Sequence, residues 1–267
     1  MIMWMLALVA LSGCDALNKA KDTIDGLLEP VVAEGIVLGV EPPQSQELQD
    51  LLNGSEFDSG TTVTLFMADA KEVQQIENAP IQGADVSLTG PGVNATVSEV
   101  DSGVYVLTPA DQPIEYASGD TWELRVVRTS GSSTATSTAQ VLLPAPADFS
   151  AELPAQHQNN TPISLDFTGL GFDSALVVVL DDGGNVTFSN EPKTIKEVYD
   201  FTHGTTALGV ITIPGEAFPD DGVYAVGVAG LVNTDPADLS EMNTGLSSIV
   251  SGLMKMYPVS TIPIPVP

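Results

Sequence analysis

Short β-prone segments separated by turn-forming residues fill the chain from Val31 onward, and this succession most constrains the possible fold. The segment Thr121–Val127 shows the pattern clearly, because large apolar residues alternate with polar ones. Such alternation is typical of a strand with one face in a core and the other in water. The 24 glycines and 19 prolines are scattered without a period, which suits many short strands joined by turns. The sequence therefore predicts an all-β fold.

The expected strands fall into two sets on either side of Pro144–Ala147, whose prolines cannot join a central hydrogen-bond ladder. The first set is Val31–Val40, Thr61–Met67, Ala84–Thr89, Ala95–Val100, Val104–Thr108, Thr121–Val127 and Ser133–Leu142. The second set is Ile163–Phe167, Ala175–Leu180, Val186–Ser189, Leu208–Ile213, Val223–Ala229 and a strand within 249–259. We expect one β-sandwich over 31–143, a linker over 144–147, and a second sandwich over 148–267. Its proline-rich tail from Ile262 is expected to be an edge or an extended polyproline-like end.

One pentad occurs twice, about one expected domain apart, as Asp101-Ser102-Gly103-Val104-Tyr105 and Asp220-Asp221-Gly222-Val223-Tyr224. This Asp-x-Gly-x-Tyr pattern resembles the tyrosine corner of immunoglobulin-like sandwiches. The resemblance implies that each tyrosine hydroxyl bonds back to nearby backbone and that the glycine permits the turn. The candidate structural residues are Asp101, Gly103, Tyr105, Asp220, Gly222 and Tyr224.

The positions two residues after these tyrosines are Leu107 and Val226 instead of disulfide cysteines. This resembles fibronectin type III-like and bacterial Ig-like modules, in which packing replaces the disulfide. The first half, with Gly83-Ala84-Asp85-Val86-Ser87-Leu88 before its pentad, also resembles prealbumin-like sandwiches. The fold class is therefore expected to be two tandem Ig-like, fibronectin III-like or prealbumin-like antiparallel sandwiches. Trp122 is the one tryptophan outside the N-terminal apolar run, and we expect it to anchor the core of the first sandwich.

The N-terminus carries the apolar run Met1–Ser12, followed by Gly13 and the only cysteine, Cys14. A membrane-spanning helix needs about 20 apolar residues, so the run has the length of a signal-peptide core. Leu11-Ser12-Gly13-Cys14 resembles the lipobox of bacterial lipoproteins, although the n-region carries no Lys or Arg and only its terminal amine is positive. The resemblance implies removal of residues 1–13 and attachment of a diacylglyceryl group, with palmitate-type acyl chains, to Cys14. Two acyl chains anchor a protein stably.

Residues 14–30 are expected to form the lipidated tether. A short helix that ends at Pro30 is predicted, because a set of apolar residues falls near a helical spacing: Leu17, Ala20, Ile24, Leu27 and Leu28. This helix is either a membrane-surface element or, more in keeping with its mixed charges, a stalk. The expected location is a membrane of the bacterial cell envelope. Asp15 resembles the inner-membrane retention signal of enteric bacteria and favours that membrane weakly.

The chain is strongly acidic, with 35 Asp and Glu against 8 Lys and Arg and a net charge of −27. Such a surface repels the phosphate backbone of nucleic acids, so we do not expect the protein to bind DNA or RNA. Divalent cations or a basic partner remain compatible with it. We consider Asp181, Asp182 and Asn185, or Asp220 and Asp221, as calcium ligands, because oxygen ligands in turns suit hard cations. Ordinary hairpin chemistry explains the same residues, and no metal or cofactor is predicted.

The sequence offers little for catalysis. It has no Gly-x-Ser-x-Gly nucleophile motif, no His-Glu-x-x-His zinc motif and no phosphate-binding loop. The two histidines, His157 and His203, lie far apart in polar, turn-like surroundings. No catalytic residue is therefore predicted. The expectation is a non-catalytic envelope lipoprotein whose sandwiches bind an envelope protein or a cell-wall component. The alternatives are a glycan-binding or small-ligand-binding protein, or a hydrolase with an unrecognised pair of carboxylates.

Overall fold

The computed structural model describes residues 31–52, 59–69, 80–130, 133–192, 195–202, 208–234 and 247–263. Within them the chain is nearly all β, with a large sandwich-like sheet, as the sequence predicts. The first seven strands are β1 (Val31–Val40), β2 (Gly60–Asp69), β3 (Asp85–Gly90), β4 (Val93–Asp101), β5 (Val104–Leu107), β6 (Thr121–Ser130) and β7 (Ser133–Leu142). The others are β8 (Gln156–Gln158), β9 (Ile163–Asp166), β10 (Ser174–Leu180), β11 (Val186–Ser189), β12 (Val210–Ile213), β13 (Gly222–Thr234) and β14 (Ser247–Ile262). The helices are α2 (Gln46–Leu52), α3 (Ile195–Thr202) and the 3₁₀ turn η2 (Gly215–Ala217).

Twelve strands form one hydrogen-bonded sheet in the order β11-β10-β13-β14-β1-β2-β5-β4-β3-β6-β7, with β8 also paired to β14. In its first half the sheet folds over on itself at β4. Residues Val93–Val97 pair with β3, whereas Ser98–Asp101 pair with β5, with a register shift between Glu99 and Asp101. Such shifts bend a strand and increase its twist. The two parts then face one another across a core that includes Leu65, Leu88, Tyr105, Trp122 and Val141.

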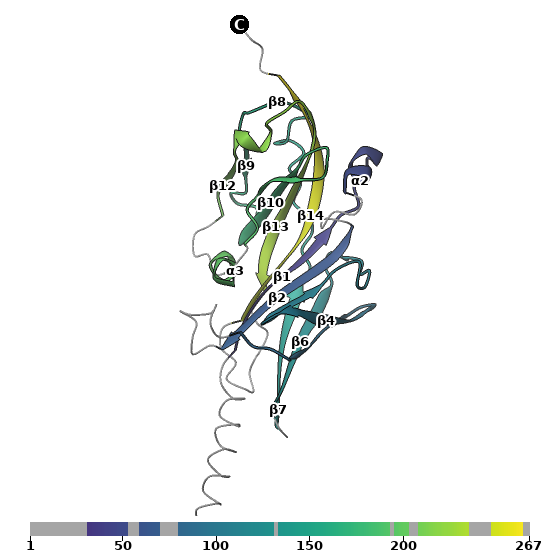
Figure 1. Cartoon of the computed structure of the whole chain (residues 1–267), viewed down its shortest axis with the longest axis vertical. Helices are drawn as coiled ribbons and strands as arrows, with labels where there is room; N and C mark the ends of the chain where they lie inside the picture. The colour runs from purple at the N-terminus through teal and green to yellow at the C-terminus, as the bar shows by residue number, and fades with distance from the viewer. Residues whose placement is uncertain are drawn as a thin grey trace, which may run out of the picture.

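The first and last long strands lie side by side at the centre of the sheet. β1 pairs with β14 in parallel, from Ala33 beside Ser247 to Val40 beside Met254. The two strands rise together along the long axis of the molecule, and β14 continues toward the end marked C (Figure 1). The hydrogen-bond network therefore runs through both halves of the chain. The predicted division at 144–147 stays a prediction, although Ala147 itself is buried in the second core.

The second half places the two-stranded sheet β9–β12 over one face of β10, β13 and β14. Phe149, Phe167 and Phe218 fill the core between them, and the rings of Phe149 and Phe167 lie 4.5 Å apart between centroids. β10 is buried along its whole length because apolar side chains cover both of its faces. This explains why Ala175–Leu180 is a continuous apolar run and not an alternation.

The opposite face of β10, β13, β14 and β1 forms a third apolar cluster, to which α2 and α3 contribute. Leu48 and Leu52 of α2 are buried there, and Phe201 of α3 packs against the cluster. Ser45 is the N-cap residue of α2, because its hydroxyl oxygen accepts a hydrogen bond from the backbone N–H of Leu48 at 3.2 Å. Within the described residues no helix is long and apolar enough to cross a membrane.

Aromatic rings cover glycines in the sheet. Trp122 is 1% exposed, and a Cβ atom on Gly90 would lie 2.3 Å from its ring. Tyr116 covers Gly39 in the same way. The expectation that Trp122 is a core anchor is confirmed.

Candidate functional site

The first pentad forms a backbone-bonded corner. The Tyr105 hydroxyl donates to the carbonyl of Ile81 at 3.2 Å and accepts from the N–H of Ala84 at 3.0 Å. Gly103 has a φ of 69°, and a Cβ atom there would lie 2.7 Å from the carbonyl oxygen of Met67. Burial raises the pKa of Tyr105, although the hydrogen bond from Ala84 opposes this effect. The hydroxyl is therefore a neutral group that ties two segments together.

The second pentad bonds locally. The Tyr224 hydroxyl donates to the carbonyl of Asp220 at 3.2 Å and accepts from the Asp220 N–H at the same distance. The Thr261 hydroxyl donates to the same carbonyl at 2.7 Å, which ties the end of β14 to this turn. Tyr105 reaches a segment more than twenty residues upstream, so the two repeated pentads differ in their bonding. Their assignment as tyrosine corners stays a prediction.

The acidic turn between β10 and β11 is organised by its own hydrogen bonds. The Asp181 carboxylate accepts from the N–H groups of Gly183 and Asn185 and from the Asn185 side chain at 2.8–3.0 Å. Desolvation acts to raise the pKa of Asp181, but these hydrogen bonds outweigh it and lower the pKa. The geometry is that of a turn stabilised by an aspartate.

Asp221 of the second acidic turn accepts from the Asn159 side chain at 3.0 Å. In the part of the chain that the structure describes, no three His, Cys, Asp or Glu side chains form a group that could hold a metal ion. Calcium binding at either turn stays a hypothesis.

His157 also makes structural contacts. Its Nε2 lies 2.8 Å from both the carbonyl and the hydroxyl oxygen of Thr161, and its ring packs edge-on against Phe218. His203 and Cys14 lie outside the described residues. The structure therefore does not bring the two histidines into one described site.

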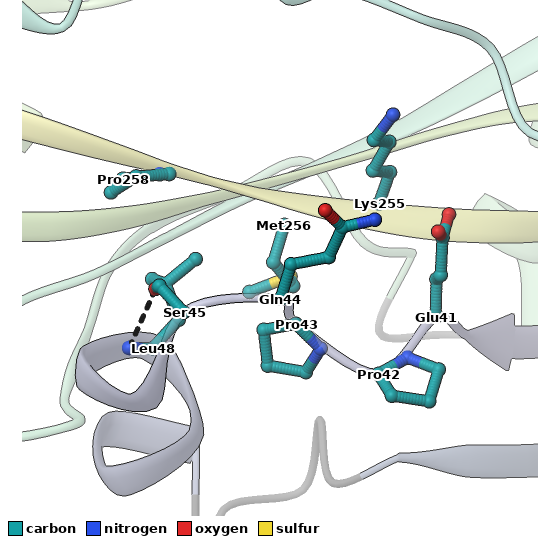
Figure 2. Close-up of a pocket in the computed structure, with 9 residues that line it drawn as sticks. All are labelled: Glu41, Pro42, Pro43, Gln44, Ser45, Leu48, Lys255, Met256 and Pro258. Atoms are coloured by element: carbon teal, nitrogen blue, oxygen red, sulfur yellow. Dashed lines mark hydrogen bonds between the residues drawn. The ribbon is translucent and has the colours of Figure 1, made fainter.

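A groove of about 250 Å³ lies between β14 and the segment that follows β1 (Figure 2). Pro42, Pro43 and Leu48 form one wall, and Met256 and Pro258 of β14 form the other. Glu41 and Lys255 supply its charged side chains. Lys255 Nζ lies 4.0 Å from Asp148 Oδ1 and 5.7 Å from the centre of the Tyr257 ring. The groove is mainly apolar, with the cation Lys255 and the acid Glu41 at its rim.

The strand β1 carries a buried carboxyl group, Glu34, which was not among the predicted site residues. Glu34 is fully buried, and its Oε2 accepts a hydrogen bond from the Thr202 hydroxyl of α3 at 2.7 Å. The Asn233 side chain donates to the Thr202 carbonyl at 2.9 Å, and the Ser248 hydroxyl donates to Asn233 Oδ1 at 2.7 Å. We call Glu34, Thr202, Asn233 and Ser248 the buried polar cluster. It links β1, α3, β13 and β14.

Burial raises the pKa of Glu34 to about 8, although the hydrogen bond from Thr202 opposes this effect. Glu34 is therefore neutral near pH 7 and holds a proton inside the protein. A signal was present in the sequence, because Glu34 is the one charged residue in the otherwise apolar segment Val31–Val40. Its partners come from distant positions that local patterns do not connect.

The chain matches no known family model and no curated protein. Among solved structures, it is similar to the three Ig domains I67–I69 of titin, at 9% identity and a TM-score of 0.22, covering 85% of this chain and 66% of that one. It is similar to a bacterial ice-binding adhesin at 14% identity and a TM-score of 0.23, with coverage of 87% and 66%. It is also similar to the FN1–FN3 domains of chicken CNTN1 at 12% identity and a TM-score of 0.18, with coverage of 88% and 70%.

These similar structures include Ig and fibronectin-type domains. The chain spans just under two thirds of the length of the titin and adhesin structures. With TM-scores this low, the similarity carries no inference about function. The strand pairing of the chain itself places it in the class of all-β proteins with a large sandwich-like sheet.

Proposed function

We propose that this protein is a lipid-anchored, non-catalytic component of the bacterial cell envelope that acts as an interaction or scaffold module. The parallel pair β1–β14 carries the proposal. Because Ala33 lies beside Ser247, both strands start side by side, and the last residues of β14 lie far from these starts, at the end of the molecule marked C (Figure 1). At about 3.3 Å per residue, the 16 residues of β14 span roughly 50 Å.

A tether attached before Val31 would leave the opposite end of β14 far from the membrane. We call residues 156–161, 219–222 and 260–262 the distal end. They are joined by the pairing of Thr261 with His157 and by the bond from Asn159 to Asp221. Asp220 and Asp221 are exposed there. A basic surface of an envelope partner is the chemistry that this end would attract.

The hydrogen bonds made by the polar side chains considered above also support a non-catalytic role. The hydroxyls of Tyr105 and Tyr224 bond to backbone. The Asp181 carboxylate organises a turn, and His157 bonds to Thr161. Each of these groups is engaged in a contact that stabilises the fold.

Lipid attachment is tested by growing cells with a labelled fatty acid. We expect the wild-type protein to incorporate the label and to remain with membranes, because the acyl chains insert into the bilayer. The Cys14→Ala variant should lose both properties. Label that persists in Cys14→Ala would exclude lipidation at this residue.

The interaction role is tested by crosslinking on intact cells, followed by purification of the protein and mass spectrometry. The double variant Asp220→Asn/Asp221→Asn removes the exposed charge of the distal end with little change in side-chain size. We expect it to lose the wild-type partner. The matched control Glu115→Gln changes an exposed acid in the first half and should keep that partner. A partner retained equally by both variants would place the interaction elsewhere.

The groove beside Lys255 favours the alternative, a small-ligand-binding protein. Its apolar walls suit a small, largely apolar ligand, and a carboxylate on that ligand would pair with Lys255 in place of Asp148. If crosslinking recovers no partner, a rise in melting temperature with small carboxylic acids would support this alternative. Loss of the rise in Lys255→Met would assign the ligand to the groove.

A further inference from the structure

β7 is a long edge strand with no charged side chain. It pairs with β6 along all ten residues, and no other strand of the described residues pairs with it. Its sequence, Ser-Thr-Ala-Thr-Ser-Thr-Ala-Gln-Val-Leu, contains no proline, glycine or ionisable group. Edge strands of soluble proteins are commonly protected by charges, prolines, bulges or short length, because bare backbone groups recruit another strand. β7 has none of these protections.

The other end of the sheet differs. β11 has four residues, and its pairing with β10 shifts register between Val179 and Leu180. The acidic turn containing Asp181 and Asp182 lies directly before it, and Glu191 follows it. These features discourage pairing at β11. The contrast between the two ends is therefore one of length, regularity and charge.

Charge also separates the β6–β7 hairpin from the rest of the molecule. Residues 121–142 contain one acid, Glu123, and both arginines of the chain, Arg125 and Arg128. The rest of the chain carries the whole excess of negative charge. Two copies would repel one another over most of their surfaces and least along this hairpin.

We propose that β7 joins two copies of this chain by antiparallel edge-to-edge pairing, which extends the sheet across a two-fold axis at Ser137 or Thr138. A two-fold axis perpendicular to the sheet keeps equivalent faces on the same side. Residues of equal parity then oppose one another, since side chains alternate along a strand. On the outer face this brings threonines and Gln140 of one copy against threonines of the other. This inference does not depend on lipid attachment or on the distal end.

The composition of β7 favours a second copy over an unrelated partner. At a two-fold axis, any charged side chain meets the same charge from the other copy, which is unfavourable. A strand that pairs with itself is therefore best left uncharged. Thr136 and Thr138 can instead form cross-strand threonine pairs, which stabilise sheets. Leu142 marks the end of the available edge, because its carbonyl accepts a hydrogen bond from the Ser251 hydroxyl.

The test uses the full-length chain carrying Cys14→Ala, so that no lipid is present, and measures mass by sedimentation over a range of protein concentrations. We expect a dimer whose dissociation constant falls as ionic strength rises, because salt screens the repulsion between two acidic copies. Adding Thr138→Lys should raise the dissociation constant at least about tenfold, since it places like charges near the axis. Adding Thr96→Lys, on the exposed face of the internal strand β4, should leave it unchanged. A monomer at every concentration, or a dimer that survives Thr138→Lys, would overturn the proposal.

A second measurement tests the pairing without the lysine variant, whose fold the substitution could disrupt. Cys14 is the only native cysteine, so Cys14→Ala/Thr138→Cys carries a single thiol. A short bifunctional maleimide should convert this variant to a covalent dimer in dilute solution. Cys14→Ala/Thr96→Cys has the more exposed position and should give little dimer. Equal crosslinking of both variants would indicate random collision and would reject the pairing through β7.

Discussion

At the scale of single residues, Glu34 is a titratable group inside the sheet. A carboxyl group lies fully buried on β1 and is held by Thr202 of α3. Its raised pKa means that the folded protein keeps a proton that the unfolded chain releases at lower pH. Glu34 therefore couples the stability of the fold to pH.

The sign of this coupling follows from the pKa of about 8 in the folded state and the ordinary value of 4.5 in the unfolded chain. Between these values the folded state binds more protons, so the contribution of Glu34 is fully present below about pH 4.5 and is lost as pH rises toward 8. Glu34→Gln removes the titration. We expect the free energy of unfolding of the wild type to fall by a few kcal/mol more than that of Glu34→Gln over this range.

The measurement is denaturant unfolding of both proteins at several pH values from 5 to 9. The informative quantity is the difference between the two stabilities at each pH, since titrations common to both proteins cancel. Parallel curves would show that Glu34 does not titrate in this window. Thr96→Val, a change at an exposed position of β4, serves as a control and should give a curve parallel to the wild type.

At the scale of elements, the repeated pentad opens two strands in different ways. Gly103 adopts a left-handed φ beside the Met67 carbonyl, where a Cβ atom would clash. At Gly222 the nearest atom to an added Cβ is Asp182 Oδ2 at 3.9 Å. The same glycine in the same pentad is thus required in one copy and replaceable in the other.

We expect Gly103→Ala to destabilise the protein by roughly 1–3 kcal/mol, because it combines backbone strain with a steric clash. Gly222→Ala should change the free energy of unfolding by less than about 1 kcal/mol. Thermal and denaturant unfolding of the two variants checks this pair. Equal losses would mean that the two turns have the same requirement for glycine.

Local pattern was sufficient to predict most of the strands. β1, β7 and β11 have the predicted bounds, because turn residues mark their ends and their sequences are β-prone. The short helices α2 and α3 were missed. For α2 a signal existed: Ser45 is an N-cap residue, and Leu48, Leu51 and Leu52 follow at helical spacing.

Pairing between distant strands could not be predicted from the same patterns. The parallel contact of β1 with β14 and the change of partner within β4 depend on how whole strands meet. The buried polar cluster was missed for this reason, since Glu34, Thr202, Asn233 and Ser248 lie together only after β1, β13 and β14 have paired. The repeated tyrosines were visible in the sequence, but their different bonding partners were not.

At the scale of the whole molecule, the shared sheet predicts one cooperative unit. Leu65 is fully buried in the first core and Leu165 in the second, while β1 and β14 connect the two halves by hydrogen bonds. Leu65→Ala and Leu165→Ala should each cost about 2–5 kcal/mol. We expect both to lower the temperature of the same single transition in calorimetry. Two transitions, each shifted by only one variant, would show that the halves unfold independently.

The pairing of β1 with β14 also has a consequence for how the protein reaches its native state. Ala33 meets Ser247, so β1 finds one of its neighbours only after the long segment that separates it from β14 has been synthesised. Contacts between such distant positions make folding slow, since a long loop must close before they form. Until then one side of β1 remains open to other strands. A nascent chain of this design cannot complete its central sheet until β14 has been synthesised, and it would benefit from a holding chaperone that shields β1 in the interval.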